Sequence, residues 1–462
     1  MRKPVHLSLR TMLAAGICKL SRKLLHLAGR GGTSLPGKLA MALDKDILCR
    51  VSAGMHVILV TGTNGKTTTC RMLEKAILQV GKTCLLNRSG ANLLAGITAE
   101  FVCASDWQGR ALAEYAVIEC DEGALKQVTQ RITPDLIVVT NLFRDQLDRY
   151  GEVMHTRDEI LKGIRNTSAG TLCLNADCPL TASLAEGVSG RVLYYGINIP
   201  VGEQEDRELS DAKYCLHCGS ELSYTYYTYA HLGSWYCPKC GRRRPPVQAA
   251  VTRISEKSLQ FTDIMLTLSG AEQRARIGIP GIYNVYNALA AVTAGTALGL
   301  PVQQVLKAVR KTKAPFGRME SFDLSGHSLR MILVKNPAGC NQAIEYITGG
   351  GEDYAVVLCL NDRTADGHDI SWIWDADYEK IIRDPHQKKI WVSGVRAEDM
   401  QLRLKYAGAS ENSIRLEKDY SLLIRDMKNS PYRLFVMPNY TSMLDFREAL
   451  IKETGGNEFW KG

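Results

Sequence analysis

Six consecutive residues have the types and the order of a phosphate-binding loop: Gly62, Thr63, Asn64, Gly65, Lys66 and Thr67. They follow a short apolar run at 57–60 and lead into Thr68, as expected where a buried strand gives way to a helix. In such a loop, backbone N–H groups and the helix N-terminus face the anion, while the lysine adds a positive charge. The hydroxyl of Thr67 is placed to hold a Mg²⁺ ion that bridges two phosphates. Because Val60 stands where the general motif has its first glycine, the sequence predicts an ATP site of a variant type.

Four cysteines form two closely spaced pairs with 18 residues between the pairs: Cys215, Cys218, Cys237 and Cys240. Two thiolate pairs at this spacing are the ligand set of a tetrahedral Zn²⁺ ion. Since protein sulfurs fill all four positions, the ion would have no place for a substrate, and we expect a structural zinc ribbon. The basic run at 242–244 could bind nucleic acid, but a solvated basic loop is the commoner case. No nucleic acid partner is therefore expected.

A strand expected at 116–118 ends in the carboxylates of Glu119, Asp121 and Glu122. A carboxylate across from the phosphate loop can hold Mg²⁺ directly or through water. The alternative is a helix cap, in which Asp121 or Glu122 accepts hydrogen bonds from free backbone N–H groups. Glu119 lies nearest the end of the strand and is the preferred metal candidate. The segment 140–151 follows another apolar run, so its polar side chains would line the same crevice.

The length of 462 residues is enough for two or three domains. A hydrophobic content of 45% and a charged content of 23% describe a soluble globular protein. The net charge of +9 suits anionic partners, such as nucleotides or phospholipid head groups, without choosing among them. Ten of the fourteen cysteines are scattered, which argues for a reducing compartment. No membrane span and no signal peptide are recognised, so the expected location is the cytoplasm.

The order of apolar runs predicts an α/β fold. Residues 7–30 carry apolar side chains at helical spacing with basic residues between them, and we expect this helix to dock on the protein's own core rather than on a membrane. From 55 to about 180, apolar runs alternate with helical stretches, which predicts a parallel sheet covered by helices. Three regions are expected: an N-terminal segment at 1–54, a central ATP-binding domain at 55–313 with the ribbon inserted at about 211–245, and a smaller α/β domain at 314–462.

Several of these segments resemble the central ATPase domain of the Mur ligases. Besides the phosphate loop and Glu119, the resemblance rests on residues 140–151, 174–177, 281–291 and 317–320. Mur ligases and the related folylpolyglutamate synthases activate a carboxylate as an acyl phosphate, which an amine then attacks. The resemblance implies ATP and Mg²⁺ as cofactors and places Asn287 and Arg318 toward the nucleotide.

Two departures from the ordinary Mur ligases are visible. The phosphate loop begins at residue 62, which leaves no room for a UDP-binding N-terminal domain. Residues 334–338 read Val-Lys-Asn-Pro-Ala where those enzymes carry Asp-Tyr-Ala-His. Both departures count against a standard amino-acid-adding role.

The chain as a whole more closely resembles the MurT family, the ligase-like subunits of lipid II isoglutaminyl synthase. This likeness lies in the glycine-rich segment 31–38, the four-cysteine ribbon and the segment 360–375. It implies an ATP-dependent carbon–nitrogen ligase of peptidoglycan synthesis, which amidates the α-carboxylate of D-glutamate in lipid II at the cytoplasmic face of the membrane. A separate GatD glutaminase subunit would supply the ammonia. The family also implies that an aspartate, Asp366 or Asp369, completes the catalytic triad of that partner.

Two alternatives stay open at this point. A stand-alone ligase of the Mur or folylpolyglutamate type would turn over ATP with an amino acid and without a partner. A non-enzymatic zinc-ribbon module that uses ATP as a switch would bind nucleic acid in a salt-sensitive manner.

Overall fold

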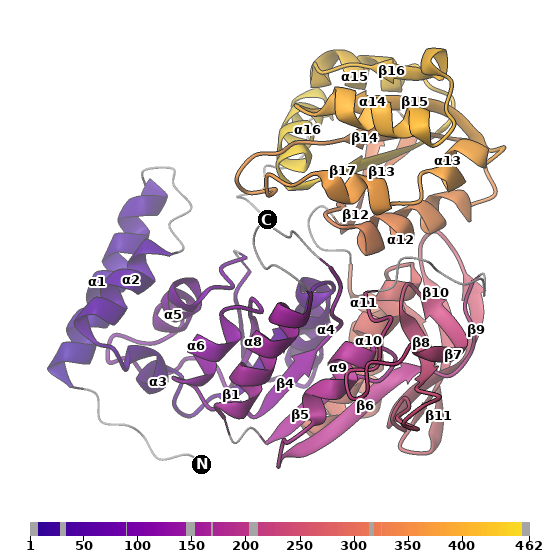
Figure 1. Ribbon diagram of the computed structural model, residues 1–462. Coiled ribbons are helices and arrows are strands. Elements are labelled where there is room, and N and C mark those ends of the chain that lie inside the picture. The colour runs from indigo at the N-terminus through magenta and orange to yellow at the C-terminus, as the bar shows by residue number, and fades with distance from the viewer. Residues whose placement is uncertain are drawn as a thin grey trace. The chain divides into compact units, whose positions relative to one another are not determined.

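The computed structural model describes residues 8–27, 34–88, 90–144, 153–167, 170–202, 211–313, 318–324 and 326–454 (Figure 1). This part of the chain divides into two compact units, one from residues up to 143 with 153–312, and one from residue 144 with the residues from 313 onward. Some positions named above lie outside the described residues, namely 31–33, 145–151 and 317, together with the side chain of Arg318.

The first unit is built on a nine-stranded sheet with the order β11-β10-β9-β6-β5-β4-β1-β3-β2. The strands are β1 (His56–Thr61), β2 (Cys84–Leu86), β3 (Tyr115–Glu119), β4 (Leu136–Val139), β5 (Thr171–Asn175), β6 (Arg191–Ile197), β9 (Ala249–Lys257), β10 (Thr262–Leu268) and β11 (Ala271–Ile277). The first six strands and β9 pair in parallel, which confirms the parallel sheet expected at 55–180. The last two strands add an antiparallel edge, so the whole sheet is mixed.

Helices cover both faces of this sheet (Figure 1). On one face α4 (Lys66–Gln79), α10 (Ile282–Ala297) and α11 (Val302–Lys311) pack against one another. On the opposite face lie α6 (Leu125–Thr129) and α8 (Val153–Arg165), because right-handed crossovers from β3 to β4 and from β4 to β5 run opposite to the one from β1 to β2. The unit also contains α5 (Leu94–Cys103) and α9 (Pro179–Ala182).

Three helices precede the sheet: α1 (Leu9–Leu27), α2 (Leu35–Leu43) and α3 (Ile47–Val51). Helix α1 packs against α2 and α5 through small side chains, those of Thr11, Ala14, Ala15 and Cys18. The leucines that define its apolar stripe are exposed instead. The helix therefore docks on the protein as expected, but not through its leucine stripe, because close approach to α2 and α5 selects the face with the smallest side chains.

The ribbon is a hairpin of β7 (Ser223–Tyr229) and β8 (Leu232–Tyr236), which stands between β6 and β9 in the chain. It has a small core of its own, formed by Cys215, Leu222, Trp235 and Cys237 with Ala182. The indole Nε1 of Trp235 donates a hydrogen bond of 2.9 Å to the carbonyl of Ala176, just after β5. This bond fixes the ribbon to the carboxyl end of the sheet.

The second unit has a six-stranded sheet with the order β12-β13-β17-β14-β15-β16. Its strands are β12 (Arg318–Leu324), β13 (His327–Ile332), β14 (Tyr354–Cys359), β15 (Gln387–Ser393), β16 (Ile414–Leu416) and β17 (Arg433–Pro438). All pairs are parallel except β12 with β13. The helices are α12 (Pro337–Thr348), α13 (Glu379–Arg383), α14 (Ala397–Tyr406), α15 (Tyr420–Lys428) and α16 (Tyr440–Thr454). Across the described parts of both units, no helix is both long enough and apolar enough to cross a membrane.

Candidate nucleotide site

The glycines of the phosphate loop occupy conformations and spaces that other residues could not. Gly62 and Gly65 have φ angles of 116° and 89°, in the left-handed region that disfavours side chains. A Cβ atom on Gly62 would come within 2.4 Å of the Thr140 hydroxyl oxygen, and one on Gly65 within 2.0 Å of the Asn287 Oδ1. The loop is thus shaped by contacts with the end of β4 and with α10, which bring Asn287 next to the loop backbone.

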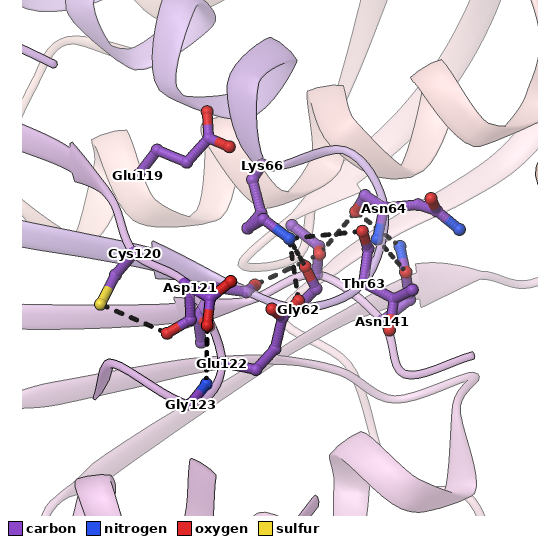
Figure 2. Close-up of polar contacts among 12 residues, drawn as sticks. Gly62, Thr63, Asn64, Lys66, Glu119, Cys120, Asp121, Glu122, Gly123 and Asn141 are labelled. Carbon is purple, nitrogen blue, oxygen red and sulfur yellow. Dashed lines mark hydrogen bonds and ion pairs between the residues drawn. The ribbon is translucent and has the colours of Figure 1, made fainter. Parts of the chain in front are cut away.

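The residues after β4 hold the loop open. The Asn64 N–H donates to Asn141 Oδ1 at 2.9 Å, and the Asn141 Nδ2 donates back to the Asn64 carbonyl at 3.0 Å. The Thr140 hydroxyl donates to the same carbonyl at 2.7 Å, and the Thr63 N–H donates to the Asn141 carbonyl at 2.9 Å. Figure 2 shows Asn141 facing Asn64 across the loop. These bonds fix the loop backbone without any ligand.

Lys66 is the first residue of α4 and its ammonium group lies inside the loop (Figure 2). Nζ donates to the carbonyl oxygens of Gly62 at 2.6 Å and Thr63 at 3.3 Å, and it forms an ion pair of 2.8 Å with Glu122. Burial lowers the pKa of Lys66, but the carboxylates of Glu122 and Glu119 outweigh it, so the pKa is raised above 10.5. The lysine is therefore charged and aimed at the space that a phosphate would fill.

The hydroxyl of Thr67 donates a hydrogen bond of 2.7 Å to Glu119 Oε2. Glu119 is held at the end of β3 by Asn87, whose Oδ1 accepts from the Glu119 N–H at 2.9 Å and whose Nδ2 donates to the Glu119 carbonyl at 2.8 Å. A hydroxyl oxygen and a carboxylate oxygen so close together beside the loop are hard donors of the kind that Mg²⁺ prefers. This pair fits the ion that the sequence predicts at Thr67 and Glu119.

The remaining residues predicted for the nucleotide site are the two carboxylates after Glu119, Thr68 on α4 and Asn287 on α10. Asp121 accepts a hydrogen bond of 3.0 Å from the Gly123 N–H in the turn before α6, and Glu122 pairs with Lys66. The N-cap residue of α6 is Ala124, so the side-chain helix cap that the sequence offered as an alternative is not formed there. Thr68 is buried on α4, so any contribution to a phosphate would come from its backbone N–H. Asn287 Nδ2 donates to Asn284 Oδ1 at 3.0 Å, which orients its own oxygen toward Gly65.

Three parts of this arrangement were not predicted from the sequence. They are the pairing of Lys66 with Glu122, the hydrogen bonds from Asn87 that hold Glu119, and the reciprocal bonds between Asn64 and Asn141. The nearest signal was the glutamate next to Asp121 at the strand end. The pairing of Lys66 with Glu122 depends on the direction in which the chain turns after β3, and the local sequence does not predict that direction.

The four cysteines form one cluster whose sulfur atoms all lie within 4.8 Å of one another. The Sγ atoms of Cys215 and Cys240 are 3.6 Å apart, and those of Cys218 and Cys237 are 3.4 Å apart. Four thiolates about 2.3 Å from a shared tetrahedral ion would be separated by about 3.7 Å, so the spacing fits Zn²⁺. After each pair a glycine, Gly219 or Gly241, turns back in a left-handed conformation.

The basic run beside the ribbon is used within the unit. Arg244 Nε contacts the buried Asp177 Oδ1 at 2.5 Å, and Asp177 Oδ2 accepts from the Tyr286 hydroxyl at 2.5 Å and the Ile197 N–H at 2.8 Å. Arg242 forms an ion pair with Glu186. Two of the three arginines thus form ion pairs within the unit.

In the second unit the two candidate aspartates differ in surroundings. Asp366 is buried, and its carboxylate accepts from the N–H and the hydroxyl of Thr441 at 2.7 and 2.5 Å, at the start of α16. Asp369 is partly exposed, and its Oδ1 accepts from the Ser371 N–H at 2.8 Å. The loop therefore has one carboxylate that acts as a helix cap and one that solvent or a partner can reach.

A glycine loop between a buried strand and a helix, with lysine, threonine and an acidic strand end around it, defines an α/β protein of the phosphate-loop class. Two family models match the chain and identify the family within this class. The Mur ligase middle domain matches residues 60–223, and the MurT ligase C-terminal domain matches residues 333–443. The second match covers most of the α/β unit that follows the central sheet.

Curated relatives cover nearly the full length. The chain is 35% identical to a lipid II isoglutaminyl synthase (glutamine-hydrolyzing) subunit MurT of Streptococcus pneumoniae, over 96% of this chain and 98% of that protein. It is 34% identical to the corresponding subunit of Staphylococcus aureus, over 97% of this chain and 100% of that protein. The chain belongs to the MurT family of Mur-type ligases.

Solved structures confirm the fold. MurF from Acinetobacter baumannii matches with a TM-score of 0.67 at 17% identity, over 91% of this chain and 81% of that one. Folylpolyglutamate synthase from Thermotoga maritima matches with a TM-score of 0.60 at 14% identity, over 96% and 98% of the two chains. The architecture is therefore that of the Mur ligases, as the sequence predicted.

Proposed function

We propose that this protein is the synthetase subunit of a lipid II isoglutaminyl synthase. In the proposed reaction the α-carboxylate of D-glutamate in the lipid II stem peptide attacks the γ-phosphorus of ATP, and ADP leaves. Ammonia then attacks the carbonyl carbon of the acyl phosphate, phosphate leaves, and D-isoglutamine remains. The observation that carries the proposal is the pairing of a complete phosphate loop with near full-length similarity to MurT subunits.

The described residues suit the phosphoryl step. Lys66 offers a buried positive charge where negative charge develops on the transferred phosphoryl group. Because the N–H groups of Thr63 and Asn64 are bonded to Asn141, the backbone donors to phosphate would be those at the start of α4. Thr67 and Glu119 would hold Mg²⁺, which would supply positive charge to neutralise the phosphate oxygens. Asn287 and Arg318 are proposed to contact the nucleotide. No protein nucleophile is needed, because the substrate carboxylate attacks directly.

Ammonia is proposed to come from a GatD-like glutaminase subunit, since free ammonia is scarce and mostly protonated near neutral pH. We propose that Asp369 orients the catalytic histidine of that partner, because its carboxylate is the accessible one of the two candidates. Asp366 is proposed to support the loop as the cap of α16. The four cysteines would hold a structural zinc ion, and the reaction would take place on the cytoplasmic side of the membrane.

Reconstitution tests this proposal. The purified chain is combined with a GatD-like subunit, ATP, Mg²⁺, glutamine and lipid II, and the product is analysed by mass spectrometry for conversion of a carboxylate to an amide. We expect amidation with glutamine and a loss of amidation when ATP is omitted. Unmodified lipid II in the complete mixture would contradict the proposal. ATP turnover with a free amino acid and no partner would favour a stand-alone ligase.

A further inference from the structure

Helix α1 buries its small side chains and exposes its large apolar ones, the reverse of what is expected for a helix that serves only to pack against the core. The buried face carries Thr11, Ala14, Ala15 and Cys18. The opposite face carries five leucines whose side chains are 57% to 85% exposed: Leu9, Leu13, Leu20, Leu24 and Leu27. At 100° per residue these leucines fall within about 60° of one another around the helix. They form one continuous stripe, called the leucine face below.

Leucine is favoured at buried positions, since burying one side chain contributes about 1.5–3 kcal/mol relative to leaving it in water. A stripe of five exposed leucines is an apolar patch of the kind that marks an interaction site. Leu35 and Leu39 of the neighbouring α2 are also exposed, at 51% and 38%. Exposed leucines are thus present on both helices of this packed pair.

The charge around the leucine face identifies its partner. The sequence contains eight lysines and arginines before Asp44 and no acidic residue in that stretch. The side chains of Lys23, on the edge of the leucine face, and of Lys38 on α2 make no hydrogen bond or ion pair with any described residue. Apolar side chains flanked by unpaired cations are complementary to an anionic bilayer surface.

A tryptophan lies next to the same helix. The Lys19 ammonium contacts the carbonyl oxygens of Ser105 and Asp106 at 2.6 and 2.8 Å, and it lies 5.1 Å from the ring centre of Trp107. Trp107 is 73% exposed. Tryptophan favours the interface between head groups and acyl chains, because its ring is apolar and its N–H is polar.

From these observations we infer that α1 is a membrane-surface helix, which lies parallel to an anionic bilayer with its leucine face in the head-group region. The helix does not span the bilayer, and the small-residue face keeps it attached to the protein. This inference stands independently of the proposed reaction.

Vesicle flotation of the full chain tests it, without ATP or lipid II. We expect the protein to float with phosphatidylglycerol vesicles and to bind phosphatidylcholine vesicles more weakly. Leu13→Glu, Leu20→Glu and Leu24→Glu combined should lower the partition coefficient at least tenfold. Lys23→Gln and Lys38→Gln should lower it by roughly fivefold each, on anionic vesicles only.

Leu402→Glu on α14 is the matched control, since Leu402 is 47% exposed and lies in the other unit. It should leave flotation unchanged, and melting temperatures should show that all variants fold. Equal flotation of the wild type and the triple variant would overturn the inference. So would a wild-type chain that does not float. If the triple variant instead lost co-elution with the glutaminase subunit while vesicle binding stayed unchanged, the leucine face would be a protein interface.

Discussion

Lys66 and Glu122 form an ion pair of 2.8 Å in which both side chains are less than 10% exposed. Each charge has lost its water, so each depends on the other and on the nearby carbonyl groups. When nucleotide phosphates enter the loop they compete with Glu122 for the same ammonium group. We therefore expect the pair to stabilise the fold and to oppose nucleotide binding.

Replacement of Glu122 by Gln should separate these two effects. Without the carboxylate, the buried lysine lacks its strongest partner, and removing one member of a buried pair costs about 3–5 kcal/mol. We expect a lower melting temperature without ligand and a larger stabilisation by ADP than in the wild type, both measured by differential scanning fluorimetry. Lys82→Ala is the control, because Lys82 and Glu114 form a half-exposed pair that water screens and that should contribute little to stability. If ADP raised the melting temperature of Glu122→Gln by the same amount as that of the wild type, the ion pair would not oppose nucleotide binding.

The pKa of Lys66 predicts the pH range in which the site keeps its charge. Because this pKa is raised in the folded protein, the stability from the pair is fully present below the unfolded value of about 10.4 and is lost as pH rises through the folded value. The difference in unfolding free energy between wild type and Lys66→Met should stay flat from about pH 7 to about pH 9.5. Urea titrations at several pH values measure it, and a decline centred below about pH 9 would contradict the assignment.

Glu119→Gln should weaken binding of the Mg²⁺–nucleotide complex while leaving nucleotide binding without Mg²⁺ nearly unchanged. The reason is that the amide keeps a hydrogen bond to Thr67 but removes the negative charge that a divalent cation needs. We expect a loss of about tenfold or more in Mg²⁺ affinity, measured by isothermal titration with ADP at varied Mg²⁺. Glu114→Gln, at the exposed residue just before the same strand, is the control. If ADP binding depended on Mg²⁺ equally in both variants, Glu119 would not be a ligand of the Mg²⁺ ion.

The ribbon should contain one zinc ion per chain. Cys215→Ser with Cys237→Ser should abolish zinc content, measured by plasma mass spectrometry, and should lower the melting temperature because the cluster's small core includes both residues. Cys49→Ser is the control, since Cys49 is a free, exposed cysteine. A zinc-free wild-type chain of unchanged stability would contradict a structural metal.

Asp369→Asn and Asp366→Asn should have different effects in the reconstituted complex. Loss of the accessible carboxylate should abolish glutamine hydrolysis by the partner but leave the melting temperature of this chain unchanged. Loss of the buried cap of α16 should lower that temperature, because the N–H and hydroxyl of Thr441 lose an ionised acceptor. Added ammonia should restore amidation in Asp369→Asn. Full glutaminase activity of the complex with Asp369→Asn would show that Asp369 does not orient the catalytic histidine of the partner.

The parts of the structure that depend on short sequence patterns could be predicted from the sequence. The alternation of apolar runs was sufficient for β1 to β5, and the cysteine spacing for the cluster. In the second unit β12 and β16 were missed, since three-residue and edge strands have too little apolar pattern to stand out.

The rest depends on contacts that are distant in sequence. Lys66 meets Glu122, and Gly65 meets Asn287, only because the sheet brings β1, β3 and α10 to one place. The direction of the leucine face was misjudged for a related reason. Helical periodicity shows that a stripe exists, but the size of the residues on the opposite face decides which side packs.

The ribbon leaves the sheet after β6 and returns at β9, and these two strands pair directly, with Tyr195 opposite Ala249. Excision of the hairpin would therefore leave the hydrogen-bond ladder between β6 and β9 in register. In evolutionary terms the ribbon is a separable insertion, which a lineage could gain or lose at a single junction. The main obstacle is Asp177, because a chain without Arg244 would have to supply its buried carboxylate with a new cation or replace it by a neutral side chain.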